Sequence, residues 1–149
     1  MGRERRRPAR RVDLSGKRQN NPRMARPDAV RRVKSYSAAT GYVFQYFFYE
    51  VNRTRRGLAA GTEYVYRVTA DREEMHPLRI FVERAAVEKW AKRAGRALTG
   101  TEEYAVAKMR LFRAFDELPE LATATADRWP ELRVDETNLE ELLEALDLT

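Results

Sequence analysis

The sequence predicts an α+β domain, in which a three-stranded antiparallel β-meander is followed by two α-helices packed on one face of the sheet. Three observations lead to this prediction. A dense aromatic run covers residues 42–49, two alternating apolar segments follow at residues 62–70 and 78–82, and the apolar spacing becomes helical near residue 85. Extended segments joined by short links pair as antiparallel neighbours, so these three are expected to form a meander.

The charged residues divide the chain into three parts. Lys and Arg outnumber Asp and Glu by 13 to 3 in residues 1–34 and by 14 to 9 in residues 35–115, whereas acidic residues lead by 11 to 2 in residues 116–149. The first part also holds three prolines and few large apolar side chains, a composition typical of disorder. We therefore expect a disordered basic arm at residues 1–34, the α+β domain at residues 35–118, and an irregular segment with an acidic amphipathic C-terminal helix at residues 119–149.

The first strand is expected at residues 42–52. Six of the eight residues from Tyr42 to Tyr49 are aromatic, and seven of the eight are apolar or aromatic. The run is too short to cross a membrane, and such side chains favour strands over helices. Both alternating faces of this strand are apolar, which indicates that both are covered wholly or in part. Residues 53–61, which contain two glycines, are expected to be a flexible connection that reverses the chain.

The second and third strands alternate more regularly. Residues 62–70 place apolar side chains mainly on one side, and residues 78–82 do the same after a polar turn. Alternation with a period of two is the pattern of a strand with one buried face. The side chains expected on the regular apolar sides of these two strands are Tyr64, Tyr66, Val68, Leu78, Ile80 and Val82.

Two helices follow the meander. An apolar stripe predicts a helix over residues 85–96, with its basic residues lying mainly away from the stripe. The second helix begins either at Thr101, which is followed by two acidic residues, or at Thr99, whose spacing to Glu102 fits a capping box. It is expected to end just before Pro119, because proline cannot continue a helix.

A narrow leucine stripe with acidic residues opposite predicts the last helix. It is expected to begin at Thr137, whose spacing to Glu140 again fits a capping box. Three placements are compatible with the sequence. The helix could dock on the protein's own sheet, fold against the basic arm and shield its charge, or lie in the groove of a partner.

No residue set in the sequence argues for catalysis, so we predict that the protein is not an enzyme. The single histidine, His76, precedes Pro77 in a polar turn, and none of the serines lies in a strand–turn–helix elbow. There are no cysteines, no glycine-rich phosphate loops and no clustered metal ligands. We therefore expect no metal, no cofactor and no small-molecule substrate. An enzyme built on an unfamiliar carboxylate site is the least supported hypothesis.

The location is predicted from what the chain lacks. The basic N-terminus is not followed by the apolar stretch of a secretory signal. No segment approaches the roughly 20 apolar residues that a membrane helix needs. We therefore expect a cytoplasmic protein with no membrane partner.

The surface chemistry favours a small non-catalytic module that binds the backbone of RNA or DNA, with RNA and the ribosome as the favoured setting. Clustered arginines attract phosphate backbones through the release of counterions. Arginines interleaved with aromatic rings on the second face of the sheet could let bases stack, and a basic row on the first helix offers further contacts. The residues expected to contact nucleic acid are Arg5, Arg6, Arg7, Arg10, Arg11, Arg67, Arg79, Lys89, Arg93 and Arg96.

The alternative hypothesis is a homo-oligomeric protein-interaction module that does not bind nucleic acid. A large apolar patch seldom stays bare on a monomer, so the second face of the sheet could form a homodimer or lie under the C-terminal helix. Arginine outnumbers lysine by 24 to 5, so the basic arm could reflect coding bias, and a basic helix face is often only a solvated surface. The residues expected at the homodimer interface are Phe47, Tyr49, Val65 and Phe81.

Overall fold

The computed structural model describes residues 32–123 and 130–148. The chain divides into two units, residues 1–32 and residues 33–149, and every helix and strand named below belongs to the second unit. The predicted disorder of the basic arm concerns residues that lie, up to residue 31, outside the described ranges.

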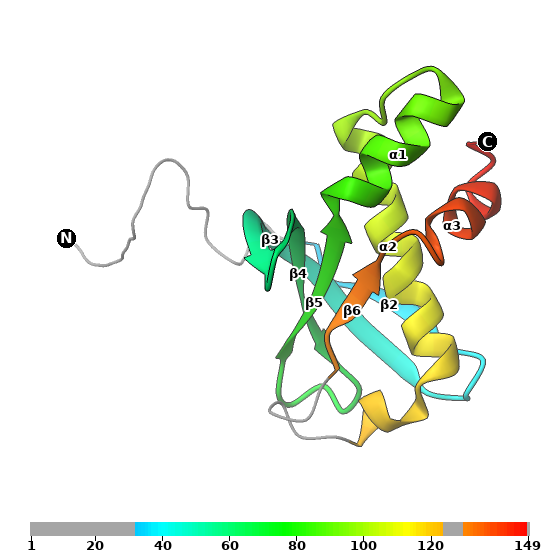
Figure 1. Ribbon diagram of the computed structural model, residues 1–149. Coiled ribbons are helices and arrows are strands. Elements are labelled where there is room, and N and C mark those ends of the chain that lie inside the picture. Colours follow the sequence, from blue (N-terminus) through cyan, green and yellow to red (C-terminus); the bar gives the residue numbers. More distant parts are fainter. Residues whose placement is uncertain (1–31, 124–129, 149) are drawn as a thin grey trace. The chain divides into compact units, whose positions relative to one another are not determined.

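Five strands form one mixed sheet (Figure 1): β2 (Lys34–Ser37), β3 (Val43–Arg56), β4 (Ala59–Thr69), β5 (His76–Glu83) and β6 (Leu132–Val134). Their order in the sheet is β2-β3-β4-β5-β6. The first four strands run antiparallel to their neighbours, in chain order, whereas β6 pairs in parallel with β5.

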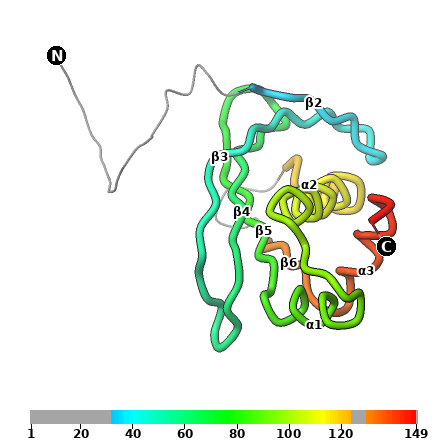
Figure 2. The backbone as a smooth tube through the Cα atoms, turned by 90° about the horizontal axis from the view of Figure 1, so that it is seen from above, coloured from blue at the N-terminus to red at the C-terminus, as the bar shows by residue number. Residues whose placement is uncertain are grey.

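Three α-helices and a short 3₁₀-helix complete the described elements: α1 (Arg84–Ala94), α2 (Gly100–Glu117), η2 (Pro119–Ala122) and α3 (Leu139–Ala145). Figure 2 shows the three α-helices on the same side of the curved sheet. None of the helices in the described part of the chain has the length and apolar character needed to cross a membrane.

The α+β class is confirmed, but the described residues form a sheet of five strands where the sequence predicts three. β2 has four residues, three of them exposed, so no apolar alternation marks it. It also includes Lys34, which the sequence assigns to the basic arm. β6 lies in the segment predicted to be irregular, and it forms where Ile80 of β5 pairs with Leu132. A strand of three residues is too short to show a periodic pattern in the sequence. Its position is determined by the edge of β5, with which it pairs.

The flexible connection predicted at residues 53–61 is instead the end of a long hairpin. β3 and β4 stay paired as far as Arg56 and Ala59, so that only Gly57 and Leu58 remain in the turn. Gly57 has a φ of 63°, which glycine adopts without strain at the first central position of a two-residue hairpin loop. The arginines before this turn are therefore strand residues.

The core lies between the helices and the inner face of the sheet. The ring of Phe44 stacks on that of Phe115, with ring centroids 4.4 Å apart and planes 8° from parallel. Burying each such side chain contributes about 1.5–3 kcal/mol relative to leaving it in water. The buried residues here include Phe44, Tyr46, Tyr66, Val68, Leu78 and Ile80 of the sheet and Leu111, Ala114 and Phe115 of α2.

The ends of the helices decide between the predicted capping residues. The Thr99 hydroxyl accepts a hydrogen bond from the Glu102 N–H (3.1 Å), and the Glu102 carboxylate accepts one from the Thr99 N–H (2.9 Å), so the capping box at Thr99 is confirmed. The box predicted at Thr137 is wrong, because α3 begins after Asn138. The Thr137 hydroxyl donates instead to a carboxylate oxygen of Asp135 at 2.5 Å.

The C-terminal helix α3 docks within the chain, on the helix side of the sheet (Figure 2). Leu139, Leu142 and Leu143 are 3%, 1% and 0% exposed and belong to the core. α3 contacts α1 and α2, so it does not cover the opposite face of the sheet.

Candidate nucleic-acid interface

The outer face of the sheet, opposite the helices, carries one arginine from each of four adjacent strands. Successive strand residues point to opposite faces, and the pairing register places these arginines on the same side as Val65 and Phe81. We name them the outer arginines: Arg56 of β3, Arg67 of β4, Arg79 of β5 and Arg133 of β6.

Phe81 organises two of the outer arginines. The guanidinium carbons of Arg56 and Arg133 lie 5.4 Å and 5.0 Å from the centroid of the Phe81 ring. The ring rests on Gly61, where a β-carbon would come within 2.6 Å of it. Arg133 is also paired with Glu83, with 3.1 Å between Nη2 and Oε2. Because Phe81 is 0% exposed, its ring supports the arginines and leaves no surface on which a base could stack.

Glu63 is the carboxylate at the centre of this network. Arg56 forms ion pairs with both Glu63 and Glu131, and the Nε of Arg79 lies 3.7 Å from a carboxylate oxygen of Glu63. The Glu63 side chain is only 11% exposed, and removing its positively charged partners would leave a buried carboxylate without compensation. Carboxylates of the same chain therefore neutralise part of the positive charge of the outer arginines.

The residues predicted for a homodimer interface all lie at the outer face, in unequal surroundings. Tyr49 sits at a bulge in β3, and its ring lies 4.2 Å from the guanidinium carbon of Arg67. Tyr49 and Phe47 are half-buried, whereas Val65 and Phe81 are 2% and 0% exposed. A partner would therefore remove little further surface of Val65 or Phe81 from water.

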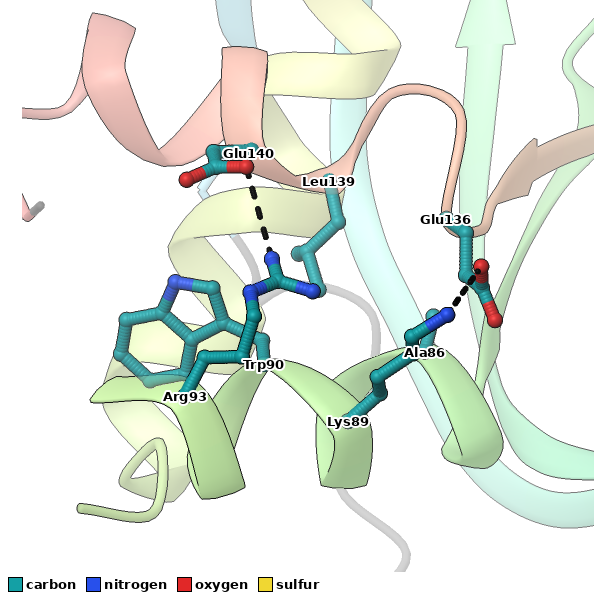
Figure 3. A pocket seen from close by; sticks show the side chains of 7 residues that line it. All are labelled: Ala86, Lys89, Trp90, Arg93, Glu136, Leu139 and Glu140. Atoms are coloured by element: carbon teal, nitrogen blue, oxygen red, sulfur yellow. Dashed lines mark hydrogen bonds and ion pairs between the residues drawn. The ribbon is translucent and has the colours of Figure 1, made fainter. Parts of the chain in front are cut away.

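The basic row on α1 faces acidic residues that precede or belong to α3 (Figure 3). Lys89 Nζ lies 3.0 Å from a carboxylate oxygen of Glu136, and Arg93 Nη2 lies 3.4 Å from one of Glu140. All four side chains are exposed by more than half, so each pair contributes about 0–1 kcal/mol to stability. The pairs nevertheless neutralise much of the charge that the row would offer to a phosphate.

A cavity of about 180 Å³ lies between α1 and α3, and a second of about 340 Å³ adjoins it beside Trp90. Figure 3 shows Trp90, Arg93 and Leu139 together around the first cavity. Arg96 lies over the Trp90 ring at 5.2 Å and pairs with Glu102 at 2.9 Å. Acidic and basic side chains thus alternate around this groove, which does not concentrate charge of either sign.

The end of the β3–β4 hairpin differs from both the outer face of the sheet and the basic row on α1. Arg53 and Arg55 are exposed, and neither forms an ion pair with any of the described residues. Among the described residues, Arg55 donates to the backbone oxygen of Leu58 alone, at 3.3 Å, and Leu58 is 98% exposed. β5 stops pairing with β4 at Gly61, so the last residues of the ribbon extend beyond it (Figure 2). We name Arg53, Arg55 and Leu58 the hairpin tip.

Two tyrosine hydroxyls, that of the buried Tyr64 and that of the half-buried Tyr36, hold strands to α2. Burial raises the pKa of the Tyr64 phenol, and its hydrogen bond to Glu103 (2.6 Å) raises it further. The hydrogen bond to Asp116 (2.7 Å) raises the pKa of Tyr36 to about 12. Both phenols therefore stay protonated near neutral pH and hold a strand to α2. The described ranges also contain no group of His, Asp and Glu side chains that could hold a metal ion.

The structure separates the residues predicted to contact nucleic acid. Arg67 and Arg79 lie on the outer face of the sheet, whereas the α1 row lies on the helix side. The arm residues lie outside the described ranges; they are Arg5, Arg6, Arg7, Arg10 and Arg11. The hairpin tip is not among the predicted residues, although three arginines within the four residues before a glycine are the sequence signal that could have identified it.

The chain was compared with protein-family models, with curated proteins and with solved structures, and none of the three comparisons found a match. Its function has to be inferred from the residues and their geometry.

Proposed function

We propose that this protein is a non-catalytic module that binds the phosphate backbone of nucleic acid. The N-terminal arginines supply most of the affinity, and the outer arginines and the hairpin tip position the folded unit. The observation that carries the proposal is the exposure of Arg53 and Arg55 without acidic partners among the described residues. Exposed, uncompensated arginines are the groups that release counterions when they meet a phosphate backbone.

The net charge of the two units supports this division of roles. Residues 1–32 hold 12 Lys and Arg against 3 Asp and Glu, whereas residues 33–149 hold 17 against 20. A polyanion is therefore attracted to the first unit and weakly repelled by the second as a whole. Contacts to the folded unit have to be local, and the hairpin tip is a place where positive charge is locally in excess.

The surroundings of the outer rings favour contacts to the backbone over contacts to bases. Phe81 is fully buried, and the ring of Tyr49 already carries the guanidinium of Arg67. A guanidinium stacked on a ring can still donate to phosphate oxygens from the N–H groups that remain accessible, although the Nε of Arg67 is buried. Such contacts fix the position of a protein on nucleic acid but read little sequence. We therefore expect binding with weak sequence preference.

The test is fluorescence anisotropy of labelled RNA and DNA of about 25 nucleotides or base pairs, titrated with the whole chain at several salt concentrations. For duplex DNA, we expect substitution of both Arg53 and Arg55 by Gln to lower the slope of log affinity against log salt by about 2. The matched control substitutes two exposed residues, Arg72 of the turn after β4 and Lys92 of α1, by Gln and is expected to leave most of the slope unchanged.

Substituting the five arm arginines Arg5, Arg6, Arg7, Arg10 and Arg11 by Gln is expected to have a larger effect, lowering that slope by about 4 to 5 units. A wild-type chain that binds neither single-stranded nor double-stranded nucleic acid at low salt contradicts the proposal. Equal effects of the tip variant and its control contradict the role of the hairpin tip.

A second candidate function is self-association, which the open edge of β3 favours. β2 pairs with β3 only from Val43 to Tyr46, so within the described ranges the residues from Glu50 to Arg56 have no strand on that side. A strand edge of this length can accept an antiparallel strand from a second copy of the chain. The edge offers a route to a homodimer that does not depend on the buried side chains of the outer face.

The two candidate functions respond to salt in opposite directions. Arg53 and Arg55 lie on the open edge, so two copies repel each other there at low salt and pair more readily when the charge is screened. Sedimentation velocity at about 0.1 M and about 1 M salt is the measurement. A dimer that grows with salt supports self-association, and a monomer under both conditions excludes it.

A further inference from the structure

We propose that the hairpin tip enters the minor groove of duplex DNA, with Leu58 wedged between neighbouring base pairs. The insertion rests on the proposed binding of nucleic acid, and it names the form of nucleic acid and the side chain that enters it. Leu58 carries the inference because it is 98% exposed at the turn of a ribbon that extends beyond the rest of the sheet.

The position of Leu58 suits a wedge. Gly57 provides the tight turn, so the apolar side chain stands at the end of the hairpin with Arg55 bonded to its backbone oxygen at 3.3 Å. An apolar side chain in water gains free energy by entering the stacked interior of a duplex. No other strand of the described residues pairs with Arg55 or Arg56 besides β4, so a duplex can approach this end.

The charges around Leu58 suit the phosphates that border a groove. Arg53 and Arg55 are two residues apart, so they lie on the same side of the ribbon with about 7 Å between their Cα atoms. Neither has an acidic partner among the described residues. Arg56, on the other side, is held by Glu63 and fixes the base of the tip.

Duplex DNA fits this combination better than RNA. Proteins that bind the DNA minor groove combine arginines with an inserted apolar side chain, and leucine is one of the side chains that serve as the wedge. The inserted side chain partly unstacks one base step and kinks the duplex, which widens the groove around it. An RNA duplex has a wide, shallow minor groove that gives a wedge little depth.

The experiment uses the whole chain and two duplexes of about 25 base pairs, one intact and one with a central nick, each labelled at both ends for energy transfer. The nick removes part of the unstacking penalty, so we expect the nicked duplex to bind about tenfold more tightly and the ends of the bound duplex to approach each other. Substitution Leu58→Ser is expected to reduce the preference to within about twofold and to abolish the bend.

Two variants serve as controls. Val51→Ser changes an apolar residue of β3 that is 49% exposed and lies away from the turn, and it is expected to keep both the preference and the bend. Arg53→Gln combined with Arg55→Gln is expected to weaken binding to both duplexes equally, because phosphates border the groove with or without a nick. Thermal melting of each variant confirms that its fold is intact.

The outcomes separate the insertion from the proposed function. If Leu58→Ser bends DNA and prefers the nick as the wild type does, the insertion is wrong and backbone binding stands. Binding of single-stranded RNA without binding of duplex DNA likewise overturns the insertion and leaves the proposed backbone binding in place. A loss of affinity for anionic vesicles in Leu58→Ser, with duplex binding unchanged, would assign the tip to a membrane surface and overturn the insertion. A wild-type chain without affinity for any nucleic acid overturns both proposals.

Discussion

Two arginines adjacent in β3, Arg55 and Arg56, have opposite surroundings. Arg56 lies on the outer face, over the ring of Phe81 and between two carboxylates, whereas Arg55 is exposed and, within the described ranges, donates only to the backbone of Leu58. The alternation of a strand is enough to place them on opposite sides. The number of arginines in a segment therefore does not measure the positive charge that remains available to a partner.

The same distinction separates the α1 row from the hairpin tip. Lys89 and Arg93 are exposed, but acidic residues of the C-terminal segment face them across the groove. The hairpin tip has no such counterpart in the described ranges. Exposure and pairing together, rather than exposure alone, identify the charge available for binding.

Among the residues of the outer face, the largest effect is expected under Arg56, at Gly61. In Gly61→Ala the new β-carbon would lie 2.3 Å from the Val82 backbone oxygen and 2.6 Å from the Phe81 ring. Relieving these contacts has to shift the pairing of β4 with β5, so we expect the free energy of unfolding to fall by about 2–3 kcal/mol. Gly57→Ala meets no atom within 4 Å and is expected to lose only about 1–2 kcal/mol, for its positive φ. Urea denaturation measures both losses of stability. Equal losses would contradict the close packing of the Phe81 ring against Gly61.

The next effect is expected at the two adjacent arginines themselves. Arg56→Gln leaves Glu63 with only the more distant Arg79, and we expect it to lower the free energy of unfolding by about 1–3 kcal/mol. Arg55→Gln is the matched control, with an expected change within about 0.5 kcal/mol. Adding Glu63→Gln to Arg56→Gln is expected to recover part of the loss, because the unpaired charge is removed. Similar losses of stability in Arg56→Gln and Arg55→Gln would contradict the different roles assigned to the two arginines.

A smaller effect, adjustable with pH, is expected at the bond between Tyr36 and Asp116. This hydrogen bond raises the pKa of Tyr36 from 10.0 to about 12, so the folded state holds the phenol proton more tightly than the unfolded state. The resulting stabilisation is fully present below pH 10 and is lost as the pH rises from 10.0 to about 12. Urea denaturation of the wild type and Tyr36→Phe should show a difference in stability that shrinks across this range. A difference that stays constant would show that the bond does not depend on the proton.

The smallest effect is expected in the groove between α1 and α3. Glu140→Gln removes the partner of Arg93, but both side chains are more than half exposed, so we expect a loss of no more than about 0.5 kcal/mol. Leu143→Ala, on the buried side of α3, is expected to lose about 2–5 kcal/mol. Chemical denaturation distinguishes the two. A large loss in Glu140→Gln would mean that charge, and not leucine packing, holds α3.

The elements with a strong local pattern are the ones that the sequence predicts correctly. The alternation through Phe44 and Tyr46 marks β3, and the spacing from Thr99 to Glu102 marks the start of α2. β2 and β6 have no such pattern, because they are too short and depend on the edge of a neighbouring strand. Their positions follow from pairing across the sheet, which a single sequence does not specify.

For the candidate site, alternation predicts that Arg67 shares a face with Val65, but it does not predict which charges meet. Arg56 finds its partners 7 and 75 positions away, at Glu63 and Glu131. The pairing of the α1 row likewise depends on where α3 docks. Contacts at such separations depend on the complete fold, so the sequence could indicate the chemistry of the site but not its available charge.

The parallel pairing of β6 with β5 has a consequence for how the protein is made. Residues 132–145 supply both the last strand of the sheet and the leucines that close the core over α1 and α2. A nascent chain stalled before Leu132 therefore presents an open edge at Ile80 and an uncovered apolar surface. We expect such stalled chains to be held by chaperones and the released chain to escape them, which a pull-down of stalled and released products would reveal.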